Sequence, residues 1–111
     1  MFFDVNRATI KPESYALLDQ VAGVLVENTK LSRVRVEGHT DARGSAAANR
    51  KLSTLRAQSV VAYLVGQGVA VERLEAVGFG PDRPLDPGRS PAAHDLNRRV
   101  EFVIVERTPG P

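Results

Sequence analysis

Two short segments of this sequence carry side chains that could bind a small charged molecule. Gly38-His39-Thr40-Asp41 ends a stretch of alternating apolar and charged residues, and Arg56 lies within Leu52-Ser53-Thr54-Leu55-Arg56-Ala57. A guanidinium holds a carboxylate by two parallel hydrogen bonds, and an aspartate attracts an ammonium group. Asp41 and Arg56 could therefore hold a zwitterion by its two charged ends. A plainer alternative stays open, in which they pair with each other or with solvent.

These two side chains need a helix and a folded-back loop in order to meet. If a helix begins near Ala47, Arg56 lies roughly 14 Å along its axis, because each residue adds about 1.5 Å. Asn49 and Ser53 precede Arg56 by two turns and one turn, which predicts a polar stripe on one helix face. We expect this stripe to be distinct from the core stripe, which consists of Leu52, Leu55, Val60, Val61 and Leu64.

The hydrophobic periodicity predicts alternating strands and helices. A first helix opens at Lys11-Pro12-Glu13-Ser14, ends near Asn28, and carries its core stripe at Leu17, Leu18, Val21, Val24 and Leu25. Strands are predicted over residues 1 to 5, 32 to 37, 74 to 79 and 99 to 106, a second helix over about 47 to 65, ended by Gly66-Gln67-Gly68, and an ordered loop over 81 to 97. The expected fold is an α/β sandwich with a small mixed four-stranded sheet and two main helices on one face, in the order β-α-β-α-β-β.

The composition is typical of one globular domain over residues 1–111. Of the 111 residues, 42% are hydrophobic and 25% are charged. The 15 basic residues are interspersed with 13 acidic ones and the net charge is only +2, so we expect no nucleic-acid partner. The chain contains no cysteine, which excludes a disulfide framework and a thiolate metal site.

The start of the chain indicates a fragment of a longer protein. No apolar run approaches the roughly 20 residues that cross a bilayer, and Met1-Phe2-Phe3-Asp4 lacks the pattern of a signal peptide. Met1 directly precedes a strand that already looks under way. We therefore expect an excised domain whose membrane association comes only from a missing N-terminal part.

Metal binding and catalysis are both weakly indicated. His39 with Asp41, or His94 with Asp95, could supply metal ligands, but their spacing matches no recurrent site. No Ser or Thr has a recognisable nucleophile setting, and no pair of carboxylates is spaced to flank a pocket. We therefore expect no catalytic residue, no metal and no cofactor, and a binding module rather than an enzyme.

Five motifs, in order and covering nearly the whole chain, carry a family resemblance. They are Phe3-Asp4-Val5-Asn6-Arg7-Ala8-Thr9-Ile10-Lys11-Pro12, Gly38-His39-Thr40-Asp41-x-x-Gly44, Asn49-x-x-Leu52-Ser53-x-x-Arg56-Ala57-x-x-Val60, Gly78-x-Gly80-x-x-x-Pro84 and Asn97-Arg98-Arg99-Val100-Glu101-Phe102. Together they strongly resemble the OmpA-like C-terminal domain. Any one motif alone would be weakly specific, whereas five at family-like spacing are highly specific.

The resemblance implies non-covalent binding of peptidoglycan through the diaminopimelate residue of its stem peptide, in a periplasmic domain that ties the cell envelope to the wall. By this resemblance Asp41 receives the ammonium and Arg56 the carboxylate. Asn49, Arg98 and backbone groups near Asp4 to Asn6 complete the pocket, and Thr40 is a further candidate that would orient Asp41 through its hydroxyl. The helpers also have structural alternatives: Thr40 satisfies a backbone group, Asn6 shapes a turn, Asn49 caps the helix, and Asn97 holds the end of the loop.

The last loop departs from the resemblance. Many family members have Asn where this chain has Gly88, and a Gly-Arg pair where it has Ala93-His94, so one possible cation beside the pocket is lost. The competing function is a periplasmic protein-interaction or oligomerisation domain that keeps the fold without binding the wall, using an exposed strand edge or the proline-rich loop and possible envelope protein partners.

Overall fold

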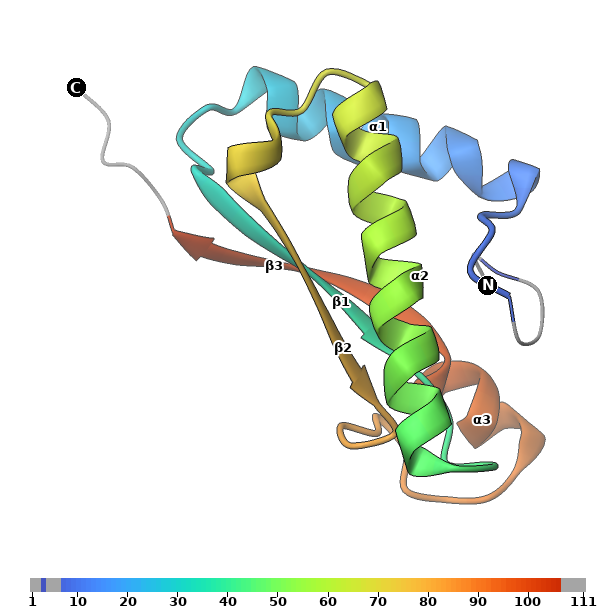
Figure 1. Ribbon diagram of the computed structural model, residues 1–111. Helices are drawn as coiled ribbons and strands as arrows, with labels where there is room; N and C mark the ends of the chain where they lie inside the picture. The colour runs from blue at the N-terminus through green and yellow to red at the C-terminus, as the bar shows by residue number, and fades with distance from the viewer. Residues whose placement is uncertain (1–2, 4–6, 107–111) are drawn as a thin grey trace.

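A computed structural model of the chain describes Phe3 and residues 7–106 (Figure 1). A short 3-10 helix, η1 (Pro12–Ser14), leads directly into α1 (Tyr15–Glu27), and α1 is followed by β1 (Arg33–His39) and the long α2 (Ala46–Gly66). The remaining elements are η2 (Val71–Arg73), β2 (Leu74–Gly80), α3 (Pro91–Asn97) and β3 (Arg99–Glu106). The predicted α/β class is confirmed, and the two main helices and the strands from β1 onward lie where the periodicity placed them.

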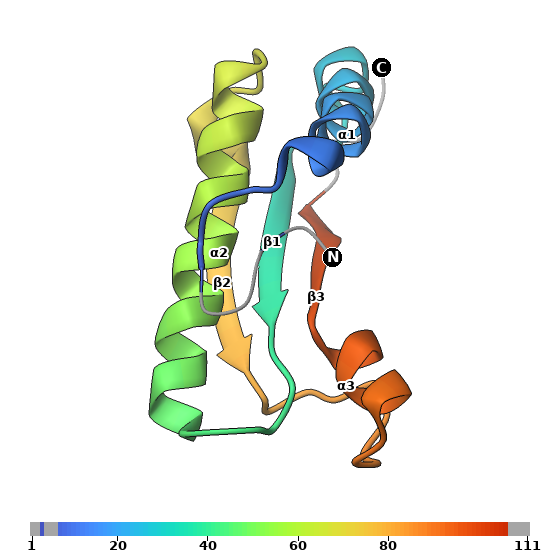
Figure 2. The ribbon, with the colours of Figure 1, turned by 90° about the vertical axis from the view of Figure 1, so that its right-hand side faces the viewer.

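The three strands form a mixed sheet in the order β2-β1-β3. β1 is parallel to β2, to which α2 supplies the crossover, and antiparallel to β3. α1 and α2 cover the same face of the sheet (Figure 2). No helix in the described part of the chain is long and apolar enough to cross a membrane.

The predicted four-stranded sheet is wrong for the described residues, which contain three strands. The strand expected over residues 1 to 5 lies outside the described residues apart from Phe3. That residue forms an isolated antiparallel bridge with Ile10 and is buried. Because Phe3 pairs with a residue shortly after it in the chain, this position joins none of the three strands, although its ring still packs in the core.

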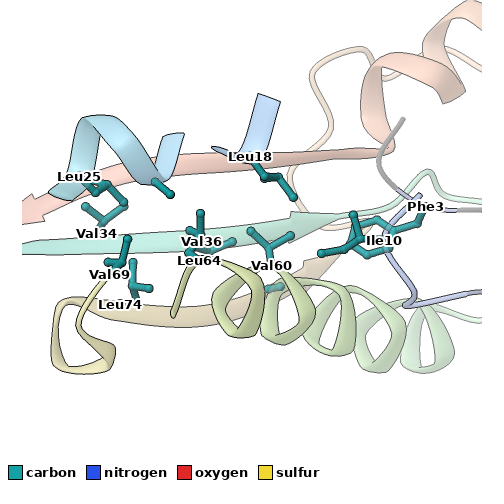
Figure 3. Packing of buried hydrophobic residues seen from close by; sticks show 12 residues of the cluster. Phe3, Ile10, Leu18, Leu25, Val34, Val36, Val60, Leu64, Val69 and Leu74 are labelled. Atoms are coloured by element: carbon teal, nitrogen blue, oxygen red, sulfur yellow. The ribbon is translucent and has the colours of Figure 1, made fainter. Parts of the chain in front are cut away.

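The core lies between the sheet and the two main helices. Figure 3 shows Leu18 and Leu25 of α1 on one side of Val34 and Val36 of β1, with Val60 and Leu64 of α2 on the other; all six are buried. The prediction that Leu17 and Val24 belong to this core is wrong, since they are 51% and 53% exposed. They line a groove beside Phe102 and Ile104 of β3, an edge strand of the described sheet, so two of the five residues of the apolar stripe of α1 are left uncovered at this edge.

The region predicted as a loop over 81 to 97 contains a helix, α3. Its N-cap is Ser90, whose side-chain oxygen accepts a hydrogen bond from the backbone N–H of Ala93 at 3.1 Å, and Pro91 stands in its first turn. Serine followed by proline is a recognised start of a helix. The sequence analysis predicted a loop because the region as a whole is rich in proline, and it did not take this local helix start into account.

Candidate functional site

Asp41 lies just beyond the carboxyl end of β1. This strand continues through Gly38 to His39, two residues further than predicted, and the N–H of Thr40 still donates to the carbonyl of Gly80 beside it at 2.9 Å. Gly38 does not end the strand. It allows α2 to approach, because a Cβ at this position would lie 2.2 Å from the carbonyl oxygen of Ser53. Asp41 is thereby held against the N-terminal half of α2.

The carboxylate of Asp41 is buried among hydrogen-bond donors. Its Oδ1 accepts the backbone N–H of Arg43 at 2.9 Å, and its Oδ2 accepts Nη2 of Arg43 and Nη1 of Arg98, both at 2.8 Å. Burial alone would raise the pKa of Asp41, but the hydrogen bonds from Arg43 and Arg98 outweigh it and hold that pKa well below its usual range. Asp41 is therefore ionised throughout the neutral pH range. Its ion pairs are with Arg43 and Arg98, so the predicted alternative of a direct pair with Arg56 is wrong.

Arg56 reaches the site from the buried face of α2. Its side chain is only 5% exposed, its Nε donates to the carbonyl oxygen of Arg7 at 2.9 Å, and its guanidinium lies 5.2 Å from the centre of the Phe3 ring. Burial lowers the pKa of Arg56, the neighbouring Arg98 cation lowers it further, and Asp41 opposes the shift. A desolvated guanidinium of this kind gains most from a ligand carboxylate, because little water competes for it.

The predicted separation between a polar and a core stripe of α2 is wrong. Ser53 and Arg56 are buried on the same face as Ala57, Val60 and Leu64. Leu55, predicted to be core, is 43% exposed. The Ser53 hydroxyl is satisfied locally, since it donates to the carbonyl of Arg50 at 2.8 Å and accepts the N–H of Gly80 at 2.9 Å.

A cavity of about 400 Å³ connects these side chains. It is lined by Thr40, Asp41, Arg43, Gly44, Asn49, Leu52, Arg56 and Arg98. Five of the seven predicted ligand-binding residues therefore line one space, namely Asp41, Arg56, Asn49, Arg98 and Thr40. The other two, Asp4 and Asn6, lie outside the described residues.

The side chains of Asn49 and Thr40 both make hydrogen bonds to the backbone around Asp41. Asn49 does not cap α2; Ser45 does, accepting from the N–H of Ala48 at 3.3 Å. Asn49 instead donates to the carbonyl oxygens of Arg43 at 2.8 Å and Asp41 at 3.4 Å, which folds the loop back over the helix. The hydroxyl of Thr40 donates to the carbonyl of Asp41 at 3.0 Å, as its structural alternative predicted.

Arg43 also lines this cavity, although the sequence did not predict it as a ligand-binding residue. Its side chain is 61% exposed and bonds Asp41 through both its backbone and its guanidinium. A local signal existed, because an aspartate side chain often bonds the backbone N–H two residues ahead of it in a turn. Gly44 follows with φ of 83°, a conformation that favours glycine and ends this turn.

The two histidines lie elsewhere. His39 is buried, and its Nε2 lies 3.2 Å from Oε1 of Glu37, on the sheet face opposite α2. His94 belongs to α3 and lines a different cavity. Neither joins a group of three metal-ligating side chains in the part of the chain that the structure describes.

Comparison with known proteins gives consistent matches. The model of the OmpA family matches residues 2–98. The peptidoglycan-associated lipoprotein of Pseudomonas aeruginosa is 40% identical over 101 residues, which cover 91% of this chain and 59% of the relative. Outer membrane porin F of Pseudomonas fluorescens is 40% identical over 102 residues, covering 92% of this chain and 31% of the relative.

A similar arrangement is found among solved structures. The crystal structure of the peptidoglycan-associated lipoprotein from Burkholderia pseudomallei superimposes with a TM-score of 0.83 at 31% identity, covering 92% of this chain and 86% of that one. The chain spans 31% and 59% of the lengths of the two sequence relatives named above. The similarity thus concerns one domain of those proteins.

Proposed function

The chain belongs to the OmpA family, and we propose that it binds peptidoglycan non-covalently through the diaminopimelate residue of the stem peptide. The observation that carries this proposal is that Asp41 and Arg56, opposite in charge, line the same cavity. The free end of diaminopimelate bears one ammonium and one carboxylate. Asp41 would take the ammonium and Arg56 the carboxylate.

The charge balance of the cavity supports an acidic ligand. Among the described residues, the guanidinium groups of Arg43, Arg56 and Arg98 line it together with one carboxylate, that of Asp41. A wall peptide carries more carboxylates than ammonium groups, so it matches this excess of positive charge. Arg43 is the displaceable cation, because its exposed side chain now occupies the oxygen that a ligand ammonium needs.

The proposed activity is binding without catalysis, in the periplasm, as part of a protein attached to the cell envelope. Each charge-assisted hydrogen bond contributes about 1.5 to 3 kcal/mol, and desolvation and lost ligand freedom oppose it, so one site should bind weakly. The wall presents many copies of the ligand. Repeated engagement on this polymer then replaces high affinity for a single peptide.

Sedimentation with purified peptidoglycan tests the assignment. The wild-type domain should sediment with diaminopimelate-type wall, whereas Asp41→Asn and Arg56→Met should remain in solution, because each loses one of the two charged contacts. Lysine-type wall lacks the carboxylate that Arg56 would meet. Wild type should therefore bind the diaminopimelate-type wall more strongly than the lysine-type wall. Any residual binding by Arg56→Met should be equal for the two wall types.

Arg50→Ala is the matched control, since it removes an arginine from the same helix whose partner is Asp82 rather than Asp41. It should sediment like wild type. Circular dichroism melting must show that all three variants are folded. Full sedimentation of folded Asp41→Asn and Arg56→Met would refute the site.

A further inference from the structure

A second cavity, of about 230 Å³, adjoins the first. It is lined by Thr40, Ala42, Pro81, Pro84, Asp86, Pro87, Gly88, Arg89, His94 and Asn97. Thr40 lines both cavities, whereas Asp41 and Arg43 line only the first and Ala42 only the second. The segment from Thr40 to Ala42 is therefore a wall common to both spaces.

The far side of the second cavity is held in place by Asn97, which is 3% exposed. Its Oδ1 accepts the N–H groups of Leu85 at 2.8 Å and Asp86 at 3.1 Å, and its Nδ2 donates to the carbonyl of Asp86 at 2.8 Å. Asn97 therefore holds the loop, as predicted. The carboxylate of Asp86 accepts the N–H of Gly88 at 2.8 Å, so one of its oxygens is already used. The cavity is formed before any ligand arrives.

Two nitrogen-bearing side chains in this cavity lack partners. Nδ1 of His94 is buried without a hydrogen bond, whereas Arg89 is exposed and makes no hydrogen bond or ion pair with any described residue. A buried polar atom without a partner is uncommon and calls for an explanation. Gly88 and His94, two positions of the last loop singled out in the sequence, both line this space.

We propose that this second cavity binds a further carboxylate of the wall peptide, with Arg89 and His94 as its donors. The inference rests on the proposed function, because the first cavity fixes the diaminopimelate beside the common wall at Thr40. Two carboxylates of the stem peptide have this chemistry: the terminal one of the D-alanine that follows diaminopimelate, and the free one of the D-glutamate that precedes it. Arg89 supplies the fixed positive charge, and Nδ1–H of His94 supplies a hydrogen bond.

Calorimetry with stem tetrapeptides tests this site. Three ligands are compared: the free acid, the D-alanine amide and the D-glutamate amide. Wild type should bind one amide about tenfold more weakly than the free acid, as expected for a lost charge-assisted hydrogen bond. Whichever amide it is identifies the carboxylate. Arg89→Ala and His94→Ala should each bind the free acid more weakly and bind that amide no differently from wild type.

Arg83→Ala is the matched control, because Arg83 is in the same loop but lies over the Phe79 ring at 3.8 Å and does not line the cavity. It should keep the full preference for the free acid.

Equal binding of all three ligands by wild type would overturn the second site while leaving the first intact. If wild type neither binds a tetrapeptide nor sediments with purified peptidoglycan, the proposed function fails. Acetate then serves as the probe: NMR shifts confined to Arg89 and His94 would still support a carboxylate site, and unshifted signals would overturn it.

Discussion

The buried face of α2 changes its chemistry halfway along the helix. Toward the C-terminal end, Val60 and Leu64 are fully buried in the apolar core. Toward the N-terminal end, the same face carries Ser53 and Arg56, which are also buried but are polar. One end is held by the volume of its side chains, and the other by hydrogen bonds and by close contact between backbones.

The close contact at the polar end depends on glycine. Gly38 of β1 and Gly78 of β2 are paired in the sheet, and a Cβ at either would lie 2.2 Å from an atom of α2. The helix therefore sits nearer the sheet here than a side chain would allow. This contact places Arg56 beside the end of β1, close to Asp41. The less apolar half of α2 is therefore the half that lines the first cavity.

The largest change in stability is expected at the apolar end. Leu64→Ala should lower the free energy of unfolding by about 2–5 kcal/mol, because it leaves a cavity in the core. The folded fraction should still bind peptidoglycan, since Leu64 does not line the site. Urea denaturation followed by circular dichroism measures the loss. Leu55→Ala, at a residue 43% exposed on the same helix, is the control and should cost much less; equal losses would contradict the division of α2 into two halves.

A smaller loss of stability, with a loss of binding, is expected at the polar end. Gly38→Ala should lower the free energy of unfolding by about 1–3 kcal/mol, because the new methyl group forces α2 away from β1. Displacement of the helix should also weaken sedimentation with the wall, unlike Leu64→Ala. Gly23→Ala is the control, because no atom lies within 4 Å of a Cβ placed there, and in the middle of α1 it should stabilise by roughly 0.5–1 kcal/mol. Unchanged binding by Gly38→Ala would show that the close contact does not position the site.

The smallest loss of stability is expected for Arg43→Ala, which should lower the free energy of unfolding near pH 7 by less than Gly38→Ala does, because this arginine is exposed and its ion pair is screened by water. It should raise the pKa of Asp41, measurable by NMR titration of its carboxyl carbon, although Arg98 still keeps that pKa below its usual range. The folded pKa is depressed, so ionised Asp41 stabilises the fold above its unfolded pKa of about 3.9, and this contribution disappears as the pH falls through the folded value. In Arg43→Ala, the stabilisation by ionised Asp41 should disappear at a higher pH than in wild type, because the folded pKa of Asp41 is higher. An unaltered Asp41 titration would mean that the pair with Arg43 does not form in solution.

Local sequence patterns predicted most helices and strands correctly, but they did not predict which residues are buried. The periodicity at Leu18 and Leu25 predicted α1 and its inner face correctly, yet it assigned Leu17 and Val24 to the same face. Whether a stripe residue is covered depends on how far the sheet extends beneath it, which is a property of strand order. In the same way, the proline-rich region was interpreted by its composition, while the cap at Ser90 started α3.

The sequence by itself determined the family, the positions of the main helices and three of the charged residues that line the first cavity, Asp41, Arg56 and Arg98, because motif spacing and periodicity are local properties of the chain. The tertiary structure decided that Arg56 is buried, that Arg98 reaches the carboxylate of Asp41, and that a second cavity lies beyond Thr40. Those facts depend on the close packing of α2 against β1 and on the hydrogen bonds that Asn97 makes to a distant loop. Contacts between residues far apart in the chain leave no signal in the spacing of either residue.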